Sequence, residues 1–153
     1  MDLAAKNFSI ALRHALFENS EWKKESFDAV VMMDVIEHLE NIVHVMEEIY
    51  RVGKGGGEVH ITTPHYSCSN SYTDPTHKHH LGFFSFDYFT GENQWGFYSK
   101  IRFRKKRSFL LFHPNPGNKI IWRIANRWPK FYEEHLAWIF PAWAMSFDLE
   151  ILK

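Results

Sequence analysis

Two carboxylates and an imidazole stand close together directly after an apolar run. Asp34, Glu37 and His38 occupy positions i, i+3 and i+4. If a helix begins at Asp34, this spacing directs all three side chains to one side. Such a set suits Mg²⁺, Mn²⁺ or Zn²⁺ when a further ligand comes from elsewhere in the chain. These residues are therefore the first candidates for a divalent metal site.

The further ligand is expected from a polar segment, residues 64–81, which is rich in Ser, Asn, Thr, Asp, Pro and His. It holds four histidines, among which His77 is the preferred metal ligand and His79 the next. The alternative is structural. In that interpretation Asp34 caps the helix, Glu37 and His38 hydrogen-bond to the neighbouring loop, and the histidines are exposed.

The elements that must position these residues form one βαβ unit. Residues 27–33 are apolar and rich in β-branched side chains, which predicts a buried strand. Apolar residues then recur every three or four positions over 36–50, as in an amphipathic helix, and glycines at 55–57 end it. Residues 58–63 alternate and predict a second, parallel strand. The polar segment follows the carboxyl end of that strand, where ligands bind in open α/β sheets.

The rest of the chain is rich in aromatic residues. We expect a short helix over 85–90, a strand, a basic turn and a second strand or strand extension over 97–112, interrupted helices over 120–143, and a closing strand over 146–152. The basic cluster at 100–107 is interpreted as a solvated turn and Glu133 with Glu134 as a solvated helical face. The tryptophans at 122, 128, 138 and 143 are expected in the core.

Composition sets broad limits on class and partners. The chain has 153 residues, of which 45% are apolar, which fits one domain. Its 18 basic and 18 acidic residues balance, so nucleic acid is not an expected partner. Cys68 is the single cysteine and fits a reducing compartment, and we expect a cytoplasmic protein with no signal peptide and no membrane span. Cys68 itself is interpreted as an incidental loop thiol.

Three stretches carry a resemblance to a known family. The run FDAVVMMDVIEHL at 27–39, EEIYRVGKGGG at 47–57 and TTP at 62–64 resemble the fourth strand, the following helix and the fifth strand of class I S-adenosylmethionine-dependent methyltransferases. This chain has Gly53 and Gly55 where Leu and Pro are common in the family. The stretches DPTHKH at 74–79 and SFDYF at 85–89 resemble a bacterial subgroup often associated with surface-glycan genes.

The resemblance implies a partial Rossmann-like α/β fold with a mostly parallel sheet, an antiparallel closing strand and no first βαβ unit. It implies that Asp34 and Val35 contact S-adenosylmethionine. It also implies a glycine-rich cofactor loop, but the glycines at 55–57 follow a helix and precede a strand, the reverse of the required order. We therefore expect a single truncated domain over 1–153, with a βαβ core at 27–63, a site loop at 64–81 and an aromatic-rich part at 82–153.

The acid-acid-histidine pattern is similar to that of metal-dependent O-methyltransferases, in which a metal lies beside the accepting hydroxyl. This similarity implies a methyltransferase acting on a small polar acceptor, with Asp34, Glu37, His38, His77 and His79 as metal ligands. Without a metal, His38 or His77 is the candidate general base, because methylation of oxygen or nitrogen removes one proton.

Two other functions remain open. The first is an inactive remnant that self-associates as a binding or assembly protein, and the second is a metal-binding protein that uses the histidines alone. For the enzyme, a homo-oligomer or a partner chain is expected to cover the missing half.

Overall fold

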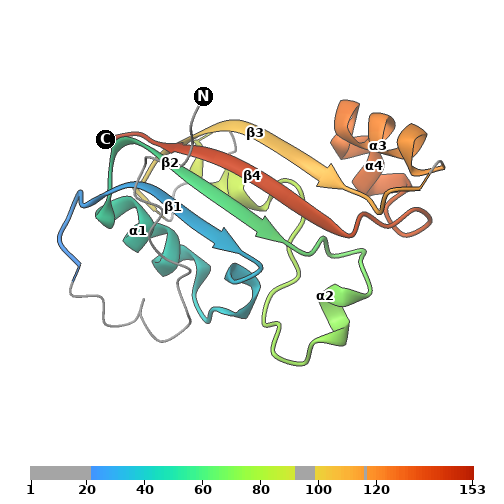
Figure 1. The fold of residues 1–153 in the computed structure, drawn as a ribbon, viewed down its shortest axis with the longest axis horizontal. Helices are drawn as coiled ribbons and strands as arrows, with labels where there is room; N and C mark the ends of the chain where they lie inside the picture. Colours follow the sequence, from blue (N-terminus) through green and yellow to red (C-terminus); the bar gives the residue numbers. More distant parts are fainter. Residues whose placement is uncertain (1–21, 92–98, 116) are drawn as a thin grey trace.

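A computed structural model describes residues 22–91, 99–115 and 117–153, which build a four-stranded sheet of order β1-β2-β4-β3. β1 (Phe27–Met33) pairs in parallel with β2 (Gly53–Thr63). β4 (Ala144–Ile151) lies antiparallel between β2 and β3 (Phe103–Leu111). Three strands therefore share one direction and the last strand of the chain opposes them (Figure 1). The predicted mostly parallel sheet with an antiparallel closing strand is confirmed.

One face of the sheet forms the core because apolar residues occupy alternate positions on each strand. Val59 and Ile61 of β2 face Leu149 and Phe147 of β4 across the ladder, and all four side chains are buried. The residues between them along β4 are polar and only partly exposed. The pattern fixes the register, since a slip of one residue would turn the apolar set toward water.

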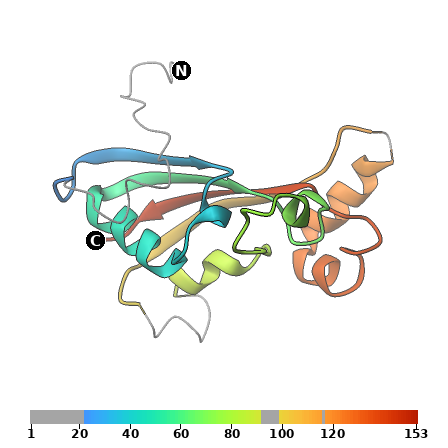
Figure 2. The same cartoon turned by 90° about the horizontal axis from the view of Figure 1, so that it is seen from below.

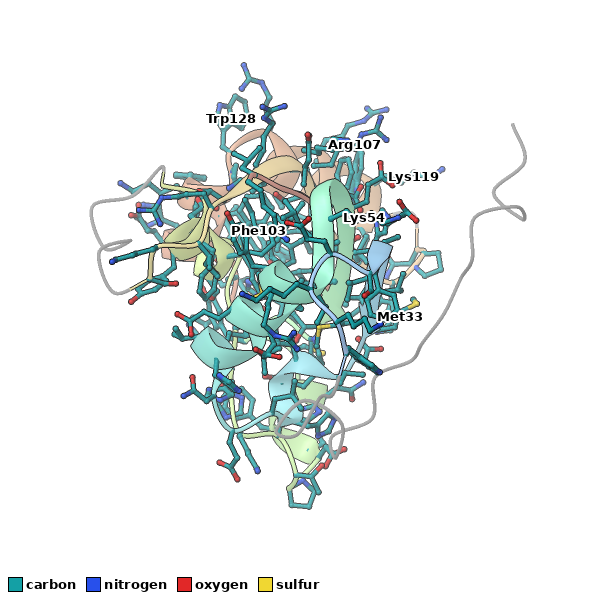
Figure 3. All side chains as sticks on the ribbon, turned by 90° about the vertical axis from the view of Figure 1, so that its left-hand side faces the viewer. Met33, Lys54, Phe103, Arg107, Lys119 and Trp128 are labelled. Atoms are coloured by element: carbon teal, nitrogen blue, oxygen red, sulfur yellow. The ribbon has the colours of Figure 1, made fainter. Side chains whose placement is uncertain are left out.

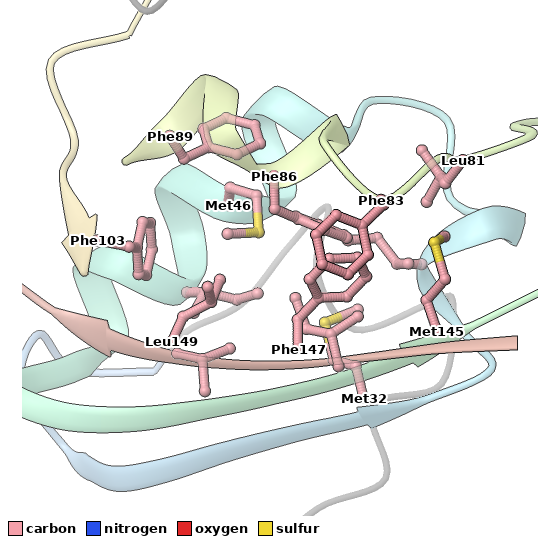
Figure 4. Close-up of a cluster of buried hydrophobic side chains, with 14 of the residues drawn as sticks. Met32, Met46, Leu81, Phe83, Phe86, Phe89, Phe103, Met145, Phe147 and Leu149 are labelled. Atoms are coloured by element: carbon pink, nitrogen blue, oxygen red, sulfur yellow. The ribbon is translucent and has the colours of Figure 1, made fainter. Parts of the chain in front are cut away.

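Two helical elements cover this apolar face. α1 (Ile42–Val52) contributes Met46 and Ile49, and the 3-10 segment η3 (Ser85–Phe89) contributes Phe86, whose ring lies 4.7 Å from that of Phe147. Figure 2 shows both elements on the same side of the sheet, and Figure 4 shows their side chains meeting the strand residues. The core thus holds the strands in place, and the carboxyl ends of β1 and β2 end beside each other.

The helix predicted over 36–50 is divided into two pieces, so the expectation of a helix beginning at Asp34 is wrong. A 3-10 turn, η2 (Ile36–His38), is followed by extended backbone at Leu39, and α1 begins only after Asn41. The Asn41 side chain accepts a hydrogen bond from the backbone N–H of His44 at 3.0 Å, which makes it the N-cap. Apolar spacing alone does not reveal this break, since a local cap set it.

The strand, basic turn and strand predicted over 97–112 are one strand, β3, in the described residues of that segment. Pairing with β4 continues along all of β3 and requires only an irregularity between Lys105 and Arg107. The cations lie on a strand and not on a turn: Arg104, Lys106 and Arg107 are exposed as expected, whereas Lys105 pairs with Asp87 and Arg104 lies 3.4 Å from Glu150. Acidic partners on neighbouring elements therefore stabilise the strand.

The helices expected over 120–143 are α3 (Asn118–Arg127) and α4 (Pro129–His135), which gather at the end of the molecule toward which β1, β2 and β3 point (Figure 1). Pro129 begins α4, as its fixed φ favours. Buried Tyr132 holds the following turn, because its hydroxyl donates to the Phe140 carbonyl at 2.7 Å and accepts from the Ala142 N–H at 2.8 Å.

The four tryptophans expected in the core are all among the exposed large hydrophobic residues: Trp122, Trp128, Trp138 and Trp143. Helical spacing predicted α3 and α4 but not which side chains of the lobe formed by α3, α4 and the turn after them would be buried. No helix in the described part of the chain is long and apolar enough to cross a membrane.

Candidate active site at the carboxyl ends of the parallel strands

A cleft of about 520 Å³ opens where β1 and β2 end. Its walls come from these strand ends, from the polar segment with its short helix α2 (Asn70–Thr73), and from the start of β4. The residues that line it are Asp34, Glu37, His38, Pro64, Asn70, Thr73, Asp74, Pro75, His77, Trp143 and Ala144. Antiparallel pairing of β4 with β2 explains why residues more than 75 positions apart share this cleft.

The chain turns sharply into the cleft at Asp34, whose φ of +52° lies in the left-handed region. Two hydrogen bonds to β2 hold this conformation. The Asp34 N–H donates to the Thr62 carbonyl at 3.0 Å, and the Thr62 hydroxyl donates to Asp34 Oδ1 at 3.2 Å. A left-handed non-glycine residue costs about 1 kcal/mol. The strain is therefore stored at the rim of the cleft, where it turns the chain toward η2.

Glu37 is a buried carboxylate with one unsatisfied oxygen. Its Oε2 accepts from the Thr63 hydroxyl at 3.0 Å, whereas its Oε1 has no hydrogen-bond partner. Burial raises the pKa of this carboxyl above its ordinary value, and hydrogen bonds from its own backbone and from Thr63 oppose the increase. His77 Nε2 lies 3.9 Å from Oε1. A buried, unsatisfied oxygen beside an imidazole is the arrangement expected of an incomplete coordination site or proton-transfer pair.

His77 is held in one tautomer by the polar segment. Its Nδ1–H donates to the Ser71 carbonyl at 3.1 Å, so the lone pair of the neutral ring lies on Nε2, the atom near Glu37. Asp74 Oδ2 lies 4.0 Å from the same Nε2. The ring is almost completely buried, and its orientation toward Glu37 is therefore fixed.

His38 faces His77, with ring centroids 4.5 Å apart in an edge-to-face arrangement. The Thr76 hydroxyl gives its proton to Asp74 at 2.6 Å and therefore accepts from His38 Nδ1 at 2.9 Å. Hydrogen bonds from the side chain and backbone of Thr76 hold the pKa of Asp74 below its usual value. Asp74 and Thr76, to which the sequence alone assigned no role, thus orient the imidazole of His38. The signal was present as an Asp-x-Thr turn.

Glu37, His38 and His77 each offer a ligand atom, and these atoms lie within 4.8 Å of one another, the only such set in the described ranges. Ligands in a tetrahedral zinc site are about 3.3 Å apart, so small side-chain rotations would close the set on an ion. The buried oxygen without a partner and the two imidazoles therefore fit a divalent cation.

The other predicted ligands have different positions. Asp34 lines the cleft but is not part of this three-residue set. His79 Nε2 lies 3.3 Å from the Glu40 carbonyl, and the structure does not bring it to the other ligands. The backbone N–H groups of Lys78 and His79 both donate to the Glu37 carbonyl, at 2.8 and 3.1 Å. These bonds fix the polar segment above η2 and set the position of His77.

A second polar cluster lies between the polar segment and α4, and it corrects the interpretation of Glu133. Its Oε1 accepts from the Phe83 N–H at 2.6 Å and lies 3.2 Å from His65 Nε2. The Ser67 N–H donates to His65 Nδ1, so Nε2 carries the proton that His65 shares with Glu133. Glu133 therefore faces inward, whereas Glu134 is half exposed. The pattern of polar and apolar residues along so short a helix did not indicate that Glu133 faces inward and Glu134 outward.

The glycine run lies at the opposite end of β2 from the cleft, as its order in the sequence indicates. Gly53 and Gly57 lie at the junction of α1 and β2, and Gly56 has a φ of +76°. The glycines therefore lie in the irregular first part of β2, which connects α1 to the regular strand. Asp34 and Val35, at the end of β1, are the residues of the described ranges expected to contact the cofactor.

Comparison with known proteins shows a sequence match over part of the chain and a shared fold. Residues 2–61 match the family model described as a methyltransferase domain. No curated protein sequence matches the chain significantly. Among solved structures, a SAM-dependent methyltransferase from Archaeoglobus fulgidus has a TM-score of 0.50 and 17% identity, covering 84% of this chain and 61% of that one.

Two further structures show the same fold. A chain of the complex between the Haloferax volcanii Trm112 methyltransferase activator and a methyltransferase has a TM-score of 0.55 and 12% identity, covering 90% of this chain and 59% of that one. An S-adenosylmethionine-dependent methyltransferase from Mesorhizobium loti has a TM-score of 0.53 and 12% identity, covering 88% and 66%.

This chain spans about 60% of the length of the first two structures it matches. The described sheet is thus the part of the fold that holds the strand-end cleft. The chain therefore has the fold of S-adenosylmethionine-dependent methyltransferases over the described residues, and its residues 2–61 resemble a methyltransferase domain in sequence.

Proposed function

We propose that the chain supplies the acceptor side of an S-adenosylmethionine-dependent methyltransferase that methylates a hydroxyl group with the help of a divalent metal. The observation that carries this proposal is the buried Glu37 Oε1, which lacks a hydrogen-bond partner and lies 3.9 Å from His77 Nε2 inside the cleft. Leaving a buried acceptor unsatisfied is unfavourable, so a group that completes it is expected.

Glu37, His38 and His77 would hold the metal, and Asp34 would border it. A bound divalent cation lowers the pKa of a coordinated hydroxyl. Asp34 and Val35 would hold part of the cofactor at the end of β1, and bound S-adenosylmethionine supplies an electrophilic methyl group. The chain's own contribution is orientation: Ser71 and Thr76 fix the two imidazoles, and the polar segment excludes water from Glu37.

The same cluster supports a metal-free variant of the mechanism. His77 Nε2 then accepts the hydroxyl proton, and Glu37 at 3.9 Å stabilises the imidazolium that forms. Titration with a metal distinguishes the two variants, because only the first predicts tight binding of the ion.

A polar acceptor such as a sugar fits the walls of the cleft. Asn70, Thr73 and Asp74 offer amide, hydroxyl and carboxylate groups on one side, and Trp143 offers an aromatic surface on another. Sugars are bound by hydrogen bonds to their hydroxyls combined with apolar contact to their faces. The similarity of residues 74–79 and 85–89 to a glycan-associated subgroup supports the same class of acceptor.

A partner along β1 is part of the proposal. Within the described residues β1 pairs on one side only, so its other edge has unused N–H and C=O groups. We propose that further chain, from a second copy or another protein, pairs there and completes the cofactor site. Size-exclusion chromatography with light scattering would refute self-association if the chain is a monomer at all concentrations.

The metal is tested by isothermal titration of the chain with Mn²⁺ and Zn²⁺. Glu37→Gln keeps the volume and the bond to Thr63, and we expect it to weaken binding about tenfold or more. His79→Ala serves as the matched control and should bind like the parent, because His79 Nε2 contacts the Glu40 carbonyl. Equal affinities of the parent and Glu37→Gln would exclude this metal site.

The methyltransferase activity is tested separately by titration with S-adenosylmethionine and S-adenosylhomocysteine, followed by methyl transfer to hydroxyl-bearing sugars. Micromolar binding to the chain or to its complex supports the proposal. Failure of every preparation that contains the completed fold to bind either compound would refute it.

A further inference from the structure

The outer side of α4 carries large exposed side chains that the cleft does not use. Trp128 precedes α4, Phe131 lies on it, and Trp138 and Ile139 lie in the hydrogen-bonded turn that follows it. Buried Ala137 lies on the other side of this turn. We call these four exposed residues the aromatic stripe.

The aromatic stripe is more exposed than packing within the lobe requires. The exposed fractions are 56% for Trp128, 50% for Phe131, 68% for Trp138 and 67% for Ile139. A contiguous group of such side chains in water is unfavourable and marks a surface that contacts another apolar phase.

The charges around the aromatic stripe are predominantly positive. Residues 117–143 include four exposed basic side chains, and only two acidic ones, of which Glu133 faces inward. The exposed basic residues are Lys119, Arg123, Arg127 and Lys130. The whole chain has equal numbers of acidic and basic residues, so this positive surface is local. Figure 3 shows Trp128 and Lys119 both projecting from the body, away from the core residue Phe103.

We propose that the aromatic stripe docks the protein on the surface of an anionic lipid bilayer. Tryptophan and phenylalanine partition into the bilayer interface, and adjacent cations are attracted by anionic headgroups. The Arg127 guanidinium lies 5.7 Å from the Trp128 ring, so cation and aromatic group would reach the headgroup region together. A second copy fits less well, because a symmetric contact through the stripe would bring the cations of both copies together.

Docking would also place the cleft near the lipid. The turn after α4 leads directly to Trp143 and Ala144, which line the cleft. If the proposed function holds, the acceptor is then presented from the membrane surface. Vesicle binding itself does not depend on methyl transfer, so the two proposals can fail independently.

The test is co-sedimentation of the chain with vesicles, combined with tryptophan fluorescence. We expect binding to vesicles of phosphatidylglycerol and phosphatidylcholine, a shift of the emission to shorter wavelength, and much weaker binding to phosphatidylcholine alone. Added salt should weaken binding to the anionic vesicles.

Two double variants separate the apolar and electrostatic contributions. Trp138→Ser with Ile139→Ser, and Arg127→Glu with Lys130→Glu, should each weaken binding roughly tenfold or more. The replaced residues are exposed, so circular dichroism should show an unchanged fold. The matched control combines Met33→Ser with Lys24→Glu, which changes one exposed apolar and one exposed basic residue outside the lobe and should bind like the parent.

Three outcomes would overturn the proposal. One is no binding of the folded parent to anionic vesicles. Another is equal loss of binding in the control variant. The third is a dimer that the stripe variant abolishes while vesicle binding persists, which would assign the surface to a second copy.

Discussion

Replacement of Glu133 by alanine should destabilise the protein strongly, although the residue stands on a short helix next to exposed Glu134. Its Oε1 accepts the Phe83 N–H at 2.6 Å and the His65 Nε2–H at 3.2 Å. Phe83 and His65 are buried, so water cannot replace the lost acceptor easily. Glu133→Ala therefore leaves two buried donors without a partner.

The magnitude follows from these two donors. A buried donor left unsatisfied costs about 1–3 kcal/mol. The short bond to Phe83 belongs at the upper end of this range and the longer bond to His65 at the lower end. We expect a loss of about 4 kcal/mol in the free energy of unfolding, which in a chain of this length lowers Tm by roughly 8–16 °C.

Urea unfolding and thermal unfolding followed by circular dichroism measure this loss. Glu134→Ala is the matched control, because Glu134 forms only exposed pairs, with Lys130 and with His135, each at 3.9 Å, and it should change the free energy of unfolding by less than about 0.5 kcal/mol. Equal stability of the two variants would refute the inward role of Glu133.

Other predictions concern local contacts. Burial raises the pKa of Tyr132 to about 12, so between pH ~10 and ~12 this phenol ionises in the unfolded chain but not in the folded one, and the stability that it contributes is lost. Urea unfolding of the parent and of Tyr132→Phe measures this loss. The difference in their free energies of unfolding should shrink between pH ~10 and ~12 and be constant below pH ~10. Gly53→Ala should lower the free energy of unfolding by about 1–3 kcal/mol, because the added Cβ would lie 2.1 Å from Ile151 Cδ1. At Gly55 an added Cβ meets no atom closer than 3.5 Å, so Gly55→Ala should have the Tm of the parent in thermal unfolding. Asn41→Ala removes the N-cap of α1 and should cost about 1 kcal/mol in thermal unfolding, and an unchanged Tm would contradict that role.

Strands β1, β2 and β4 and the methyltransferase-like fold could be predicted from the sequence because their signals are local and repeated. Alternating apolar residues at 58–63 and 146–152 predicted the strands that become β2 and β4, and the apolar run at 27–33 predicted β1. The break at Leu39 was missed because the side-chain cap of Asn41 ends an apolar pattern that otherwise continues. The basic cluster on β3 was misread because its acidic partners lie on elements distant in sequence.

The sequence also predicted three candidate site residues that lie close together in the fold. Glu37 and His38 follow a strand end, and His77 stands in the polar segment after the next strand, so the topology of parallel strands predicted their approach. The fixed orientation of both imidazoles was not predictable, since it depends on the Ser71 carbonyl and the Thr76 hydroxyl. Such contacts are set by loop backbone, which no periodicity describes.

By itself the sequence predicted three of the four strands, the methyltransferase-like fold and the side of the sheet where chemistry is expected, because side-chain periodicity and strand direction are properties of the local chain. Tertiary structure alone decided which polar groups became buried partners. Glu37 lost its exposure under the polar segment, Glu133 turned toward His65, and the tryptophans of the lobe remained outside. Whether a side chain is buried depends on which distant segments pack over it. The local sequence does not specify this, because only the complete fold brings those segments together.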